Sequence, residues 1–483
     1  MQSASFTSVR SIVTVEPPPA LEGRWKDLVR EYLPHGTQES MWRYSHREQP
    51  AEPIQGWKMH LPATVSTAAN ILSATAPVLK ECGHVFKAAA SLLVVMRLNS
   101  GIHYGYSQIG KIITVYPENE IRFKELADEL ADSLGRWKDG PTVPFDLRYK
   151  DSCIYYRYGV FRSSKQNTVG GRPSALVLPD GTLAEDVRHC LPTERPWLSD
   201  PFDGSPQQNR GDEFTALNGR YLVHSAYSQR GKGGVYKCTD IMQDPARDHV
   251  LKEGRHSGET MWDGRDGKWR IDNERRVLSS LNRRFDFFPQ IYDYFEVEGN
   301  GYLVLEKIDG LDLESLINHQ YSDIALSDLL EVGRQMVTIV SAIHDDGWIW
   351  RDCKTKNFII ERSGKLRGID LEGACPRENL DPQFWSTPKF SAPEILDPQY
   401  DRSPAKPDHR ADLFSLGICL FQLFEGVLPA RVSAEPIARI SRKDIPAEVA
   451  DIVAKLLSYD ADDRPGLQDV EAVFAVALRQ QCA

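Results

Sequence analysis

The chain is 483 residues long and has a formal net charge of -10 at pH 7; 41% of its residues are hydrophobic and 26% are charged. This composition is typical of a soluble globular protein, and the length suits two or three domains because a single hydrophobic core does not grow that large. The negative charge argues against a nucleic-acid-binding surface as the main function, although it is compatible with a local basic pocket. We therefore expect no nucleic-acid partner.

Eight cysteines are spread over the sequence, without a Cys-x-x-Cys pair and without a histidine at metal-ligand spacing. This scatter favours a reduced cytoplasmic protein over a disulfide-linked one. Residues 1–10 are polar and lack the apolar core of a secretion signal, and the most apolar stretches, 88–96 and 413–424, are too short to span a bilayer. The sequence predicts a cytoplasmic protein with no membrane span.

The predicted elements divide the chain into a tail, two domains and a linker. Residues 1–20, which include three consecutive prolines, are expected to form a flexible tail, and residues 21–200 an α+β domain. In that domain we predict helices at 21–33, 67–82 and 121–134, and strands at 56–61, 111–116 and 154–161. The polar stretch 201–216 contains proline and glycine and is expected to be a linker, followed by a second domain at 217–483.

Two strands of the first domain place polar side chains on one face. Successive side chains of a strand point to opposite faces, so Lys58 and His60 share the face opposite to the apolar side chains of the strand 56–61. The same alternation directs Arg157 away from the apolar face of the strand 154–161. Taken alone, each pattern is also compatible with a solvated sheet face.

A run of residues near position 350 has the layout of a phosphoryl-transfer site. Such a site needs one carboxylate to orient the acceptor hydroxyl, and an amide with a second carboxylate to hold magnesium ions; Asp352, Asn357 and Asp370 fit these roles. Together with the later Ala-Pro-Glu at 392–394, their spacing resembles the protein kinase superfamily, whose serine/threonine members carry a lysine at the place of Lys354. The resemblance implies a bilobal kinase-like domain that uses ATP or GTP with Mg²⁺.

Nucleotide-binding residues are expected upstream of this run. Lys252 resembles the strand lysine that contacts the nucleotide phosphates, and Glu274, in a predicted helix, is its expected ion-pair partner. The glycine-rich stretch 230–237 resembles a phosphate-covering loop, in which absent side chains let backbone N–H groups approach an anion. Its glycines are Gly231, Gly233 and Gly234. Only Gly233 falls on a glycine of the kinase pattern, so a plain hairpin turn is the alternative.

Other positions of the second domain are interpreted as structural. Asp412 and Arg464 occupy places where kinases brace the carboxy-terminal lobe. The stretch 327–343 carries one apolar helical stripe behind an expected Ser327 cap, and we assign it to the core. Trp350 replaces the histidine of the His-Arg-Asp motif, a change that bears on regulation more than on catalysis.

The first domain has a second resemblance, to the amino-terminal lyase domain of class III and IV lanthipeptide synthetases. It is carried by the segments 55–60, 85–87, 98–100, 110–117 and 156–159, and by 263–267 and 369–372 in the kinase-like part. In those synthetases a lyase domain similar to phosphothreonine lyases is followed directly by a kinase, so the resemblance extends over residues 20–480. Full synthetases continue into a cyclase, whereas this sequence ends at Ala483. We expect a dehydratase without its own cyclase, a truncated chain, or cyclisation elsewhere.

The lyase resemblance implies a role for each of five residues. Lys87 would be the base that removes the α-proton, Lys58 the enolate stabiliser and His60 the general acid. Lys111 and Arg157 would clamp the phosphate, for which the planar fork of an arginine is well suited. Nearby cations would help to keep a lysine base neutral.

The sequence thus predicts a bifunctional peptide dehydratase. Its kinase would phosphorylate serine or threonine of a ribosomal precursor peptide with a leader, and its lyase would eliminate phosphate to leave dehydroalanine or dehydrobutyrine. A separate cyclase or other tailoring enzyme is a further expected partner. The alternatives are a serine/threonine protein kinase with a non-catalytic amino-terminal docking domain, and a pseudokinase scaffold. The intact candidate residues of both sites argue against these alternatives.

Overall fold

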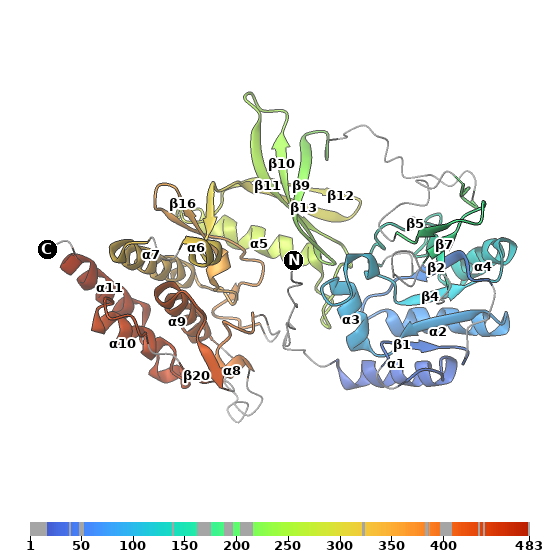
Figure 1. Cartoon of the computed structure of the whole chain (residues 1–483), viewed down its shortest axis with the longest axis horizontal. Helices are drawn as coiled ribbons and strands as arrows, with labels where there is room; N and C mark the ends of the chain where they lie inside the picture. Colours follow the sequence, from blue (N-terminus) through green and yellow to red (C-terminus); the bar gives the residue numbers. More distant parts are fainter. Residues whose placement is uncertain are drawn as a thin grey trace. The chain divides into compact units, whose positions relative to one another are not determined.

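The structure is a computed structural model, shown in Figure 1. It describes residues 17–37, 40–47, 53–137, 140–161, 175–187, 197–202, 216–320, 324–381, 385, 387–396, 408–432, 435–437 and 440–481. These residues fall into two compact units. The elements of the first predicted domain are given first, and those of the second predicted domain follow. The amino-terminal unit contains Glu16–Trp269 and Phe295–Tyr302, and the carboxy-terminal unit contains Arg270–Tyr294 and Leu303–Ala483.

A six-stranded antiparallel sheet forms the centre of the first domain. Its strand order is β1-β3-β4-β2-β6-β5. The strands are β1 (Trp42–Tyr44), β2 (Gln55–Leu61), β3 (Val85–Ala89), β4 (Ile113–Tyr116), β5 (Leu147–Arg148) and β6 (Tyr155–Val160). The helices are α1 (Pro19–Tyr32), α2 (Ala68–Glu81), α3 (Leu92–Ser100), α4 (Glu120–Ser133) and the short 3₁₀ helix η1 (Tyr106–Gln108). A separate hairpin consists of β7 (Ala175–Val177) and β8 (Leu183–Glu185).

The predicted helices and strands of the first domain are all present, with ends shifted by one or two residues. The helix predicted from residue 21 begins at Pro19, and the strand predicted from residue 111 begins at Ile113, so Lys111 precedes it. Phe202, two residues into the predicted linker, packs against the rings of Tyr149 and Tyr156. Residues 1–16 and 203–215, which cover most of the predicted tail and linker, lie outside the described residues. The domain boundaries therefore stay predictions.

The hydrophobic core of this domain lies on one face of the sheet. Trp57, Met59 and Leu61 of β2 are buried there together with Trp25 of α1 and Phe123 of α4. This confirms the apolar face predicted from the alternation along β2. The polar side chains of the same strand consequently lie on the other face.

The strand register brings the polar residues of three strands together. Lys58 on β2 pairs with Arg157 on β6, and Thr114 on β4 pairs with His60 on β2 and with Lys87 on β3. Residues that are directly opposite in a sheet share a face, so Lys58, His60, Lys87 and Arg157 lie on one face. His60 and Arg157 are only 3% and 4% exposed, which excludes the alternative of a solvated face for these two side chains.

A five-stranded sheet opens the second domain, with strand order β12-β13-β11-β10-β9. The strands are β9 (Tyr221–Arg230), β10 (Gly233–Asp240), β11 (Arg247–Gly254), β12 (Ile291–Val297) and β13 (Asn300–Glu306), and helix α5 (Gly267–Leu281) follows β11. The stretch predicted as a glycine loop is the hairpin of β9 and β10, in which Gly233 pairs with Arg230. Lys252 lies on β11, opposite Val235 of this hairpin.

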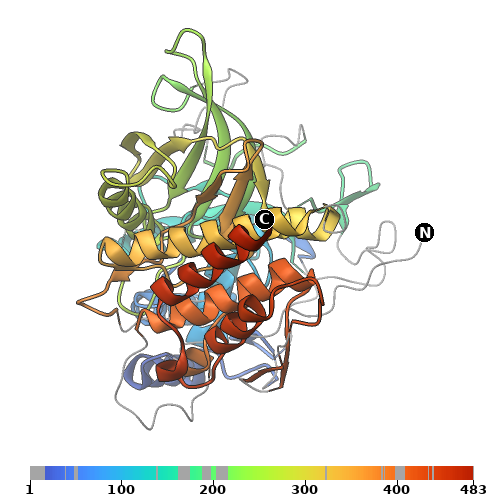
Figure 2. The ribbon, with the colours of Figure 1, turned by 90° about the vertical axis from the view of Figure 1, so that its left-hand side faces the viewer.

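The carboxy-terminal unit is mainly helical, and Figure 2 shows its helices side by side. The helices are α6 (Leu313–Gln320), α7 (Leu326–Asp345), α8 (Pro393–Leu396), α9 (Arg410–Glu425), α10 (Ala447–Leu456) and α11 (Leu467–Gln481), with the 3₁₀ helices η4 (Thr355–Asn357) and η6 (Ala461–Asp463). The short strands are β14 (Gly310–Asp312), β15 (Trp348–Ile349), β16 (Phe358–Glu361), β17 (Leu366–Gly368), β18 (Cys375–Pro376), β19 (Ala430–Val432) and β20 (Glu435–Ile437).

Helix α7 confirms the predicted apolar stripe, whose residues are buried. The predicted cap is wrong, because the helix begins at Leu326 and its N-cap is Ala325, without a side-chain cap. Burial of the stripe fixes this helix, so a capping side chain is dispensable. Within the described parts of the chain, no helix is both long enough and apolar enough to cross a membrane.

Candidate active sites

The five residues to which the lyase resemblance gave roles come together in the first domain. We call Lys58, His60, Lys87, Lys111 and Arg157 the cationic cluster. Burial, together with the positive charges of Arg157, Lys111 and Lys87, lowers the pKa of Lys58 to about 7 even though Asp186 opposes the shift. The Lys58 ammonium also donates a hydrogen bond to the Val160 carbonyl oxygen at 3.2 Å. Lys58 can therefore exchange its proton near neutral pH.

A buried carboxylate, Asp146, joins two members of the cluster. One of its oxygens lies 2.5 Å from His60 Nδ1 and the other accepts a hydrogen bond from Lys111 Nζ at 3.0 Å. Its side chain is fully buried. Burial opposes its ionisation, but Lys111 and His60 outweigh burial and hold the pKa of Asp146 well below its usual range. The preceding residue, Phe145, has a φ of 64°, a backbone conformation that the sequence did not signal.

His60 is neutral in this environment. Burial lowers its pKa to about 3, with Lys111 adding to the shift and Asp146 opposing it. A neutral imidazole that donates from Nδ1 to Asp146 carries its lone pair on Nε2. Action as a general acid therefore requires His60 to take up a proton when an anion enters the cluster.

A second carboxylate, Asp186, engages Arg157. It accepts a hydrogen bond from Arg157 Nη2 at 2.7 Å and one from the Val160 backbone N–H at 3.1 Å. Asp186 follows strand β8, outside the six-stranded sheet. The sequence reasoning missed both Asp146 and Asp186, since neither lies in a predicted strand nor forms a motif with the cluster.

Lys87 has an aromatic neighbour that the sequence reasoning also missed. Its ammonium lies 4.1 Å from the ring centroid of Trp42, on the adjacent strand β1. Such a cation–π contact stabilises the charged form of a lysine and fixes its direction. Alternation along β1 could have indicated that Trp42 shares a face with Tyr44, the residue that pairs with Lys87.

Asn99 braces the loops that carry the cluster. Its buried side chain donates to the Ala63 carbonyl oxygen at 2.8 Å and accepts from the Gly110 backbone N–H at 3.3 Å. Ala63 follows the strand of Lys58 and His60, and Gly110 precedes Lys111. Asn99 is therefore a positioning residue of this site.

The second site is centred on Asp352 in the carboxy-terminal unit. Its carboxylate accepts a hydrogen bond from Lys354 Nζ at 2.6 Å and one from the Thr387 hydroxyl at 2.7 Å. Burial raises the pKa of Asp352, and Asp370 adds to this effect while Lys354 opposes it. A raised pKa makes a carboxylate a better proton acceptor. Thr387 shows that a hydroxyl group can donate to Asp352.

Asn357 and Asp370 fit the predicted magnesium site. The side-chain amide of Asn357 donates from Nδ2 to the Asp352 backbone carbonyl oxygen at 2.9 Å, so that its side-chain oxygen Oδ1 could bind a cation. The backbone carbonyl oxygen of Asn357 accepts a hydrogen bond from the backbone N–H of Ile369, the residue before Asp370. Among the described residues, no group of three or more His, Cys, Asp and Glu side chains could hold a metal ion. Two protein oxygens still suit Mg²⁺, which usually keeps several waters and binds substrate phosphates.

The loop before Asp352 is held by buried polar contacts. The Asp412 carboxylate accepts hydrogen bonds from the backbone N–H groups of Trp350 and Arg351, at 2.7 and 2.8 Å. The Trp350 indole N–H donates to the Asp370 carbonyl oxygen at 3.1 Å. Trp350 therefore connects the two loops despite replacing a histidine, and the bracing role predicted for Asp412 is confirmed.

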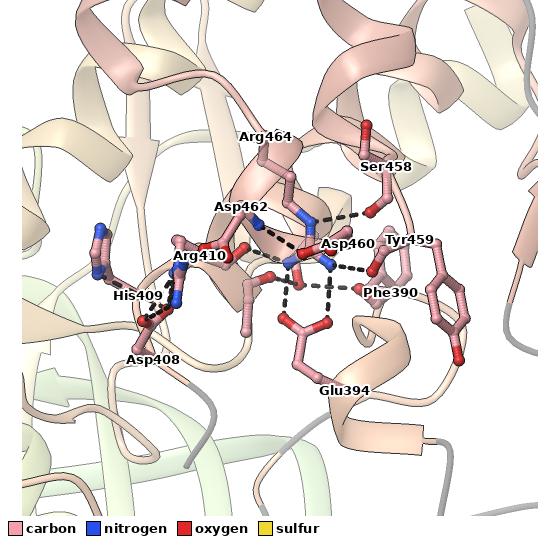
Figure 3. A network of polar contacts seen from close by, with 12 residues as sticks. Phe390, Glu394, Asp408, His409, Arg410, Ser458, Tyr459, Asp460, Asp462 and Arg464 are labelled. Atoms are coloured by element: carbon pink, nitrogen blue, oxygen red, sulfur yellow. Dashed lines mark hydrogen bonds and ion pairs between the residues drawn. The ribbon is translucent and has the colours of Figure 1, made fainter. Parts of the chain in front are cut away.

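Two further contacts order the surroundings of this loop. The Arg351 guanidinium donates to the Asp381 carboxylate at 2.8 Å, and both side chains are 11% exposed. Arg464 forms two hydrogen bonds with Glu394, at 2.7 and 2.8 Å, and Figure 3 shows this pair within a larger polar network. The structural interpretation of Arg464 is thus confirmed.

For the predicted nucleotide-binding residues, the structure gives contacts of Glu274 and Gly231 but leaves their roles as predictions. The buried Glu274 side chain accepts a hydrogen bond from the Leu371 backbone N–H at 3.2 Å. Lys252 belongs to the other unit, so its ion pair with Glu274 stays a prediction. The turn of the β9–β10 hairpin is held by the Gly231 N–H, which donates to the Ser100 carbonyl oxygen at 3.1 Å. The phosphate-binding role of its glycines also stays a prediction.

Two family models match the chain. The model for "RamC, N-terminal domain" matches residues 28–213, and the model for the protein kinase domain matches residues 228–473, which is more than half of the chain. The chain therefore belongs to the protein kinase family, and ahead of the kinase domain it carries a RamC-type amino-terminal domain, the order found in class III lanthipeptide synthetases.

Curated relatives agree with these matches. A probable SapB synthase of Streptomyces coelicolor is 28% identical over 415 residues, which cover 82% of this chain and 43% of that protein. The protein kinase C-like 2 of Schizosaccharomyces pombe is 28% identical over 40% of this chain and 20% of its own length. The citron rho-interacting kinase of Rattus norvegicus is 27% identical over 33% and 8%. The chain spans less than half the length of these relatives.

Proposed function

We propose that the protein is a bifunctional dehydratase acting on a peptide: its kinase domain phosphorylates serine or threonine, and its RamC-type domain eliminates the phosphate. The main observation behind this proposal is the cationic cluster: Lys58 and Arg157 pair across two strands beside His60, and His60, Lys111 and Arg157 are buried. Phosphoryl transfer by a kinase does not itself require such a cluster. A phosphorylated side chain, by contrast, requires cations for its phosphate and proton-transfer groups for elimination.

In the phosphorylation step, Asp352 orients the acceptor hydroxyl and accepts its proton. Lys354, held at 2.6 Å from Asp352, places a positive charge beside the transferred phosphoryl group. Asn357 and Asp370 would hold Mg²⁺, which supplies charge neutralisation for the phosphates of ATP or GTP. Lys252, with Glu274 as its partner, and the hairpin glycines would contact the nucleotide. The product is a phosphoserine or phosphothreonine side chain.

In the elimination step, Lys87 acts in its neutral form to remove the α-proton, and Lys58 stabilises the enolate. The electron pair then forms the Cα–Cβ double bond, and the Cβ–O bond breaks. Lys111 and Arg157 hold the phosphate, while His60 donates a proton to the departing oxygen. The products are inorganic phosphate and dehydroalanine or dehydrobutyrine. Asp146 supports this step because its carboxylate favours the imidazolium form that His60 must adopt.

The family and the relatives support the proposed substrate class. A ribosomal precursor peptide with a leader is the substrate that the synthetase arrangement implies, and the match to a probable SapB synthase supports it. A separate cyclase or tailoring enzyme is a further proposed partner.

A synthetic phosphothreonine peptide, supplied without nucleotide, tests the elimination step apart from the kinase. Wild-type protein and Asp370→Asn should both remove phosphoric acid, as read by mass spectrometry, because the kinase residues are not required. Lys87→Ala should be slower by roughly a hundredfold to ten-thousandfold, the usual cost of losing a general base.

A leader-bearing precursor with nucleotide and Mg²⁺ completes the test. Asp370→Asn should leave it unmodified, whereas Lys87→Ala and His60→Ala should accumulate phosphopeptide. If wild-type protein phosphorylates but eliminates from neither substrate, the first domain is a docking module of a serine/threonine kinase, and the proposal is wrong.

A further inference from the structure

The carboxylate of Asp186 occupies a position suited to an anion within the cationic cluster. It accepts hydrogen bonds from the Arg157 guanidinium at 2.7 Å and from the Val160 backbone N–H at 3.1 Å. Its side chain is only 6% exposed. A guanidinium N–H and a backbone N–H that converge on one oxyanion are the donors with which proteins also bind phosphate.

Asp186 also lies beside the second cation of the sheet pair. A Cβ atom built on Gly159 would lie 3.0 Å from a carboxylate oxygen of Asp186 and 3.1 Å from Lys58 Nζ, so both groups border the same small space. The Asp186 carboxylate is therefore hydrogen-bonded to Arg157 and lies near Lys58. A side chain at position 159 would be in tight contact with both groups, so either would have to shift slightly to admit it.

The two carboxylates of the cluster differ in how they are anchored. Asp146 is fully buried and immediately precedes strand β5 of the six-stranded sheet. Asp186 instead follows the β7–β8 hairpin, which pairs only within itself in the described structure, and Leu183 at the start of β8 is 40% exposed. Gln55 attaches this hairpin to β2, through hydrogen bonds of 2.8 and 2.7 Å with the backbone of Val177.

We propose that Asp186 holds the phosphate position of the cationic cluster in the free protein, and that the phosphate of the substrate displaces it. This inference rests on the proposed lyase function. A dianionic phosphate brings more charge and more acceptor oxygens than one carboxylate, so it can displace Asp186 where an unmodified serine or threonine cannot. Asp186 thereby makes the site selective for the phosphorylated side chain, and Gln55 keeps the hairpin attached meanwhile.

Removing the competing carboxylate should strengthen phosphate binding. Inorganic phosphate is the probe, and its dissociation constant is measured by calorimetry for the wild-type chain, Asp186→Asn and the control Glu185→Gln. Asp186→Asn should bind phosphate at least about tenfold more tightly, equivalent to about 1.4 kcal/mol. Glu185→Gln changes the charge by the same amount one residue away, and should stay within about twofold of wild type.

Exchange of backbone amide hydrogens in the wild-type chain tests the same displacement without a variant. Saturating phosphate should speed exchange in residues 175–187, because the hairpin loses its contact with Arg157, while α4 is unaffected. Unchanged exchange in that segment would overturn the inference even if Asp186→Asn failed to fold. Equal or weaker phosphate binding by a folded Asp186→Asn would also overturn it, since the carboxylate would then serve only to orient Arg157.

The two proposals fail in different ways. A wild-type protein that eliminates phosphate from phosphothreonine peptide, together with an Asp186→Asn variant of unimproved phosphate affinity, refutes the displacement and leaves the lyase intact. A wild-type protein that neither eliminates nor binds phosphate refutes the lyase function and the displacement with it.

Discussion

Replacing Asp146 by asparagine tests the electrostatic organisation of the cationic cluster most directly. The substitution keeps the shape of the side chain but removes the buried negative charge that contacts both His60 and Lys111. His60 and Lys111 contact different oxygens of Asp146, so an asparagine in the same orientation keeps an acceptor opposite only one of them. We therefore expect a buried cation without its counter-charge and a histidine less able to become protonated.

The expected loss of stability is large because the ion pair is buried: the Asp146 side chain is 0% exposed and that of Lys111 is 5% exposed. Removing one partner of such a pair costs about 3–5 kcal/mol in the free energy of unfolding. Elimination should fall by roughly a hundredfold to ten-thousandfold, the range for a disabled acid catalyst, while phosphorylation of a precursor is unchanged.

The loss of stability caused by Asp146→Asn should depend on pH in a defined direction. The pKa of Asp146 is held well below its usual range in the folded chain, because Lys111 and His60 outweigh the effect of burial. A carboxylate of this kind contributes stability above its unfolded pKa of about 4 and loses it as the pH falls further. The difference in unfolding free energy between wild type and Asp146→Asn should thus be full at pH 7 and shrink below about pH 4.

The assay combines urea unfolding with elimination from a phosphothreonine peptide. Asp128→Asn is the control, because the Asp128 carboxylate likewise accepts from two groups, Tyr149 and Lys150, but on the surface. With side chains 64% and 61% exposed, its ion pair with Lys150 should contribute no more than about 1 kcal/mol. If Asp146→Asn eliminated phosphate within threefold of wild type and unfolded at the same urea concentration, the reasoning would be refuted.

Three further predictions concern single contacts. Trp350→Phe removes the indole N–H that donates to the Asp370 carbonyl oxygen, which should lower the free energy of unfolding by about 1–3 kcal/mol. Phosphorylation of the precursor should become slower, while elimination from a phosphopeptide is unchanged. Equal phosphorylation rates of the variant and the wild type would contradict this. Asp381→Ala removes the carboxylate partner of Arg351, so phosphorylation should fall, whereas Asp381→Glu should retain most of it. Burial lowers the pKa of His60 from 6.5 to about 3, so the unfolded chain binds more protons than the folded chain between these pH values. The free energy of unfolding of the wild-type chain should therefore decrease as the pH is lowered through this window. His60→Gln should lose less stability between pH 7 and 4.5, as measured by urea unfolding.

The sequence was most informative where a strand imposes a period of two. Alternation alone separated Lys58 and His60 from the apolar face of β2, and directed Arg157 away from the apolar side of β6. It could not show that these side chains are opposite one another, because register depends on how strands distant in sequence pair. The burial of this polar face was equally unpredictable, since it depends on what covers the sheet.

The carboxylates were missed for a different physical reason. Asp146 lies beside a residue with a φ of 64°, and Asp186 follows a three-residue strand, so neither has a periodic pattern around it. Their importance arises only from contacts with cations 35 and 29 residues away, Lys111 and Arg157 respectively. The kinase motif was easier to predict from the sequence, because Asp352 and Asn357 are close in sequence and their spacing reflects a single loop.

Charge balance in the cationic cluster bears on the order of the two proposed reactions. Lys58, Lys87, Lys111 and Arg157 face the carboxylates of Asp146 and Asp186, so this set carries up to two more positive than negative charges. The excess helps burial to lower the pKa of Lys58 to about 7. Displacement of Asp186, as proposed above, would raise this excess to up to three, and a phosphate monoester, with a charge of about -1.5 to -2 at neutral pH, would offset at least about half of it. An unmodified serine or threonine contributes none, so the cluster discriminates against a peptide that the kinase has not yet modified. If the proposed function is correct, phosphorylation precedes entry into the RamC-type domain, and the charge added by the first reaction is the main binding determinant of the second.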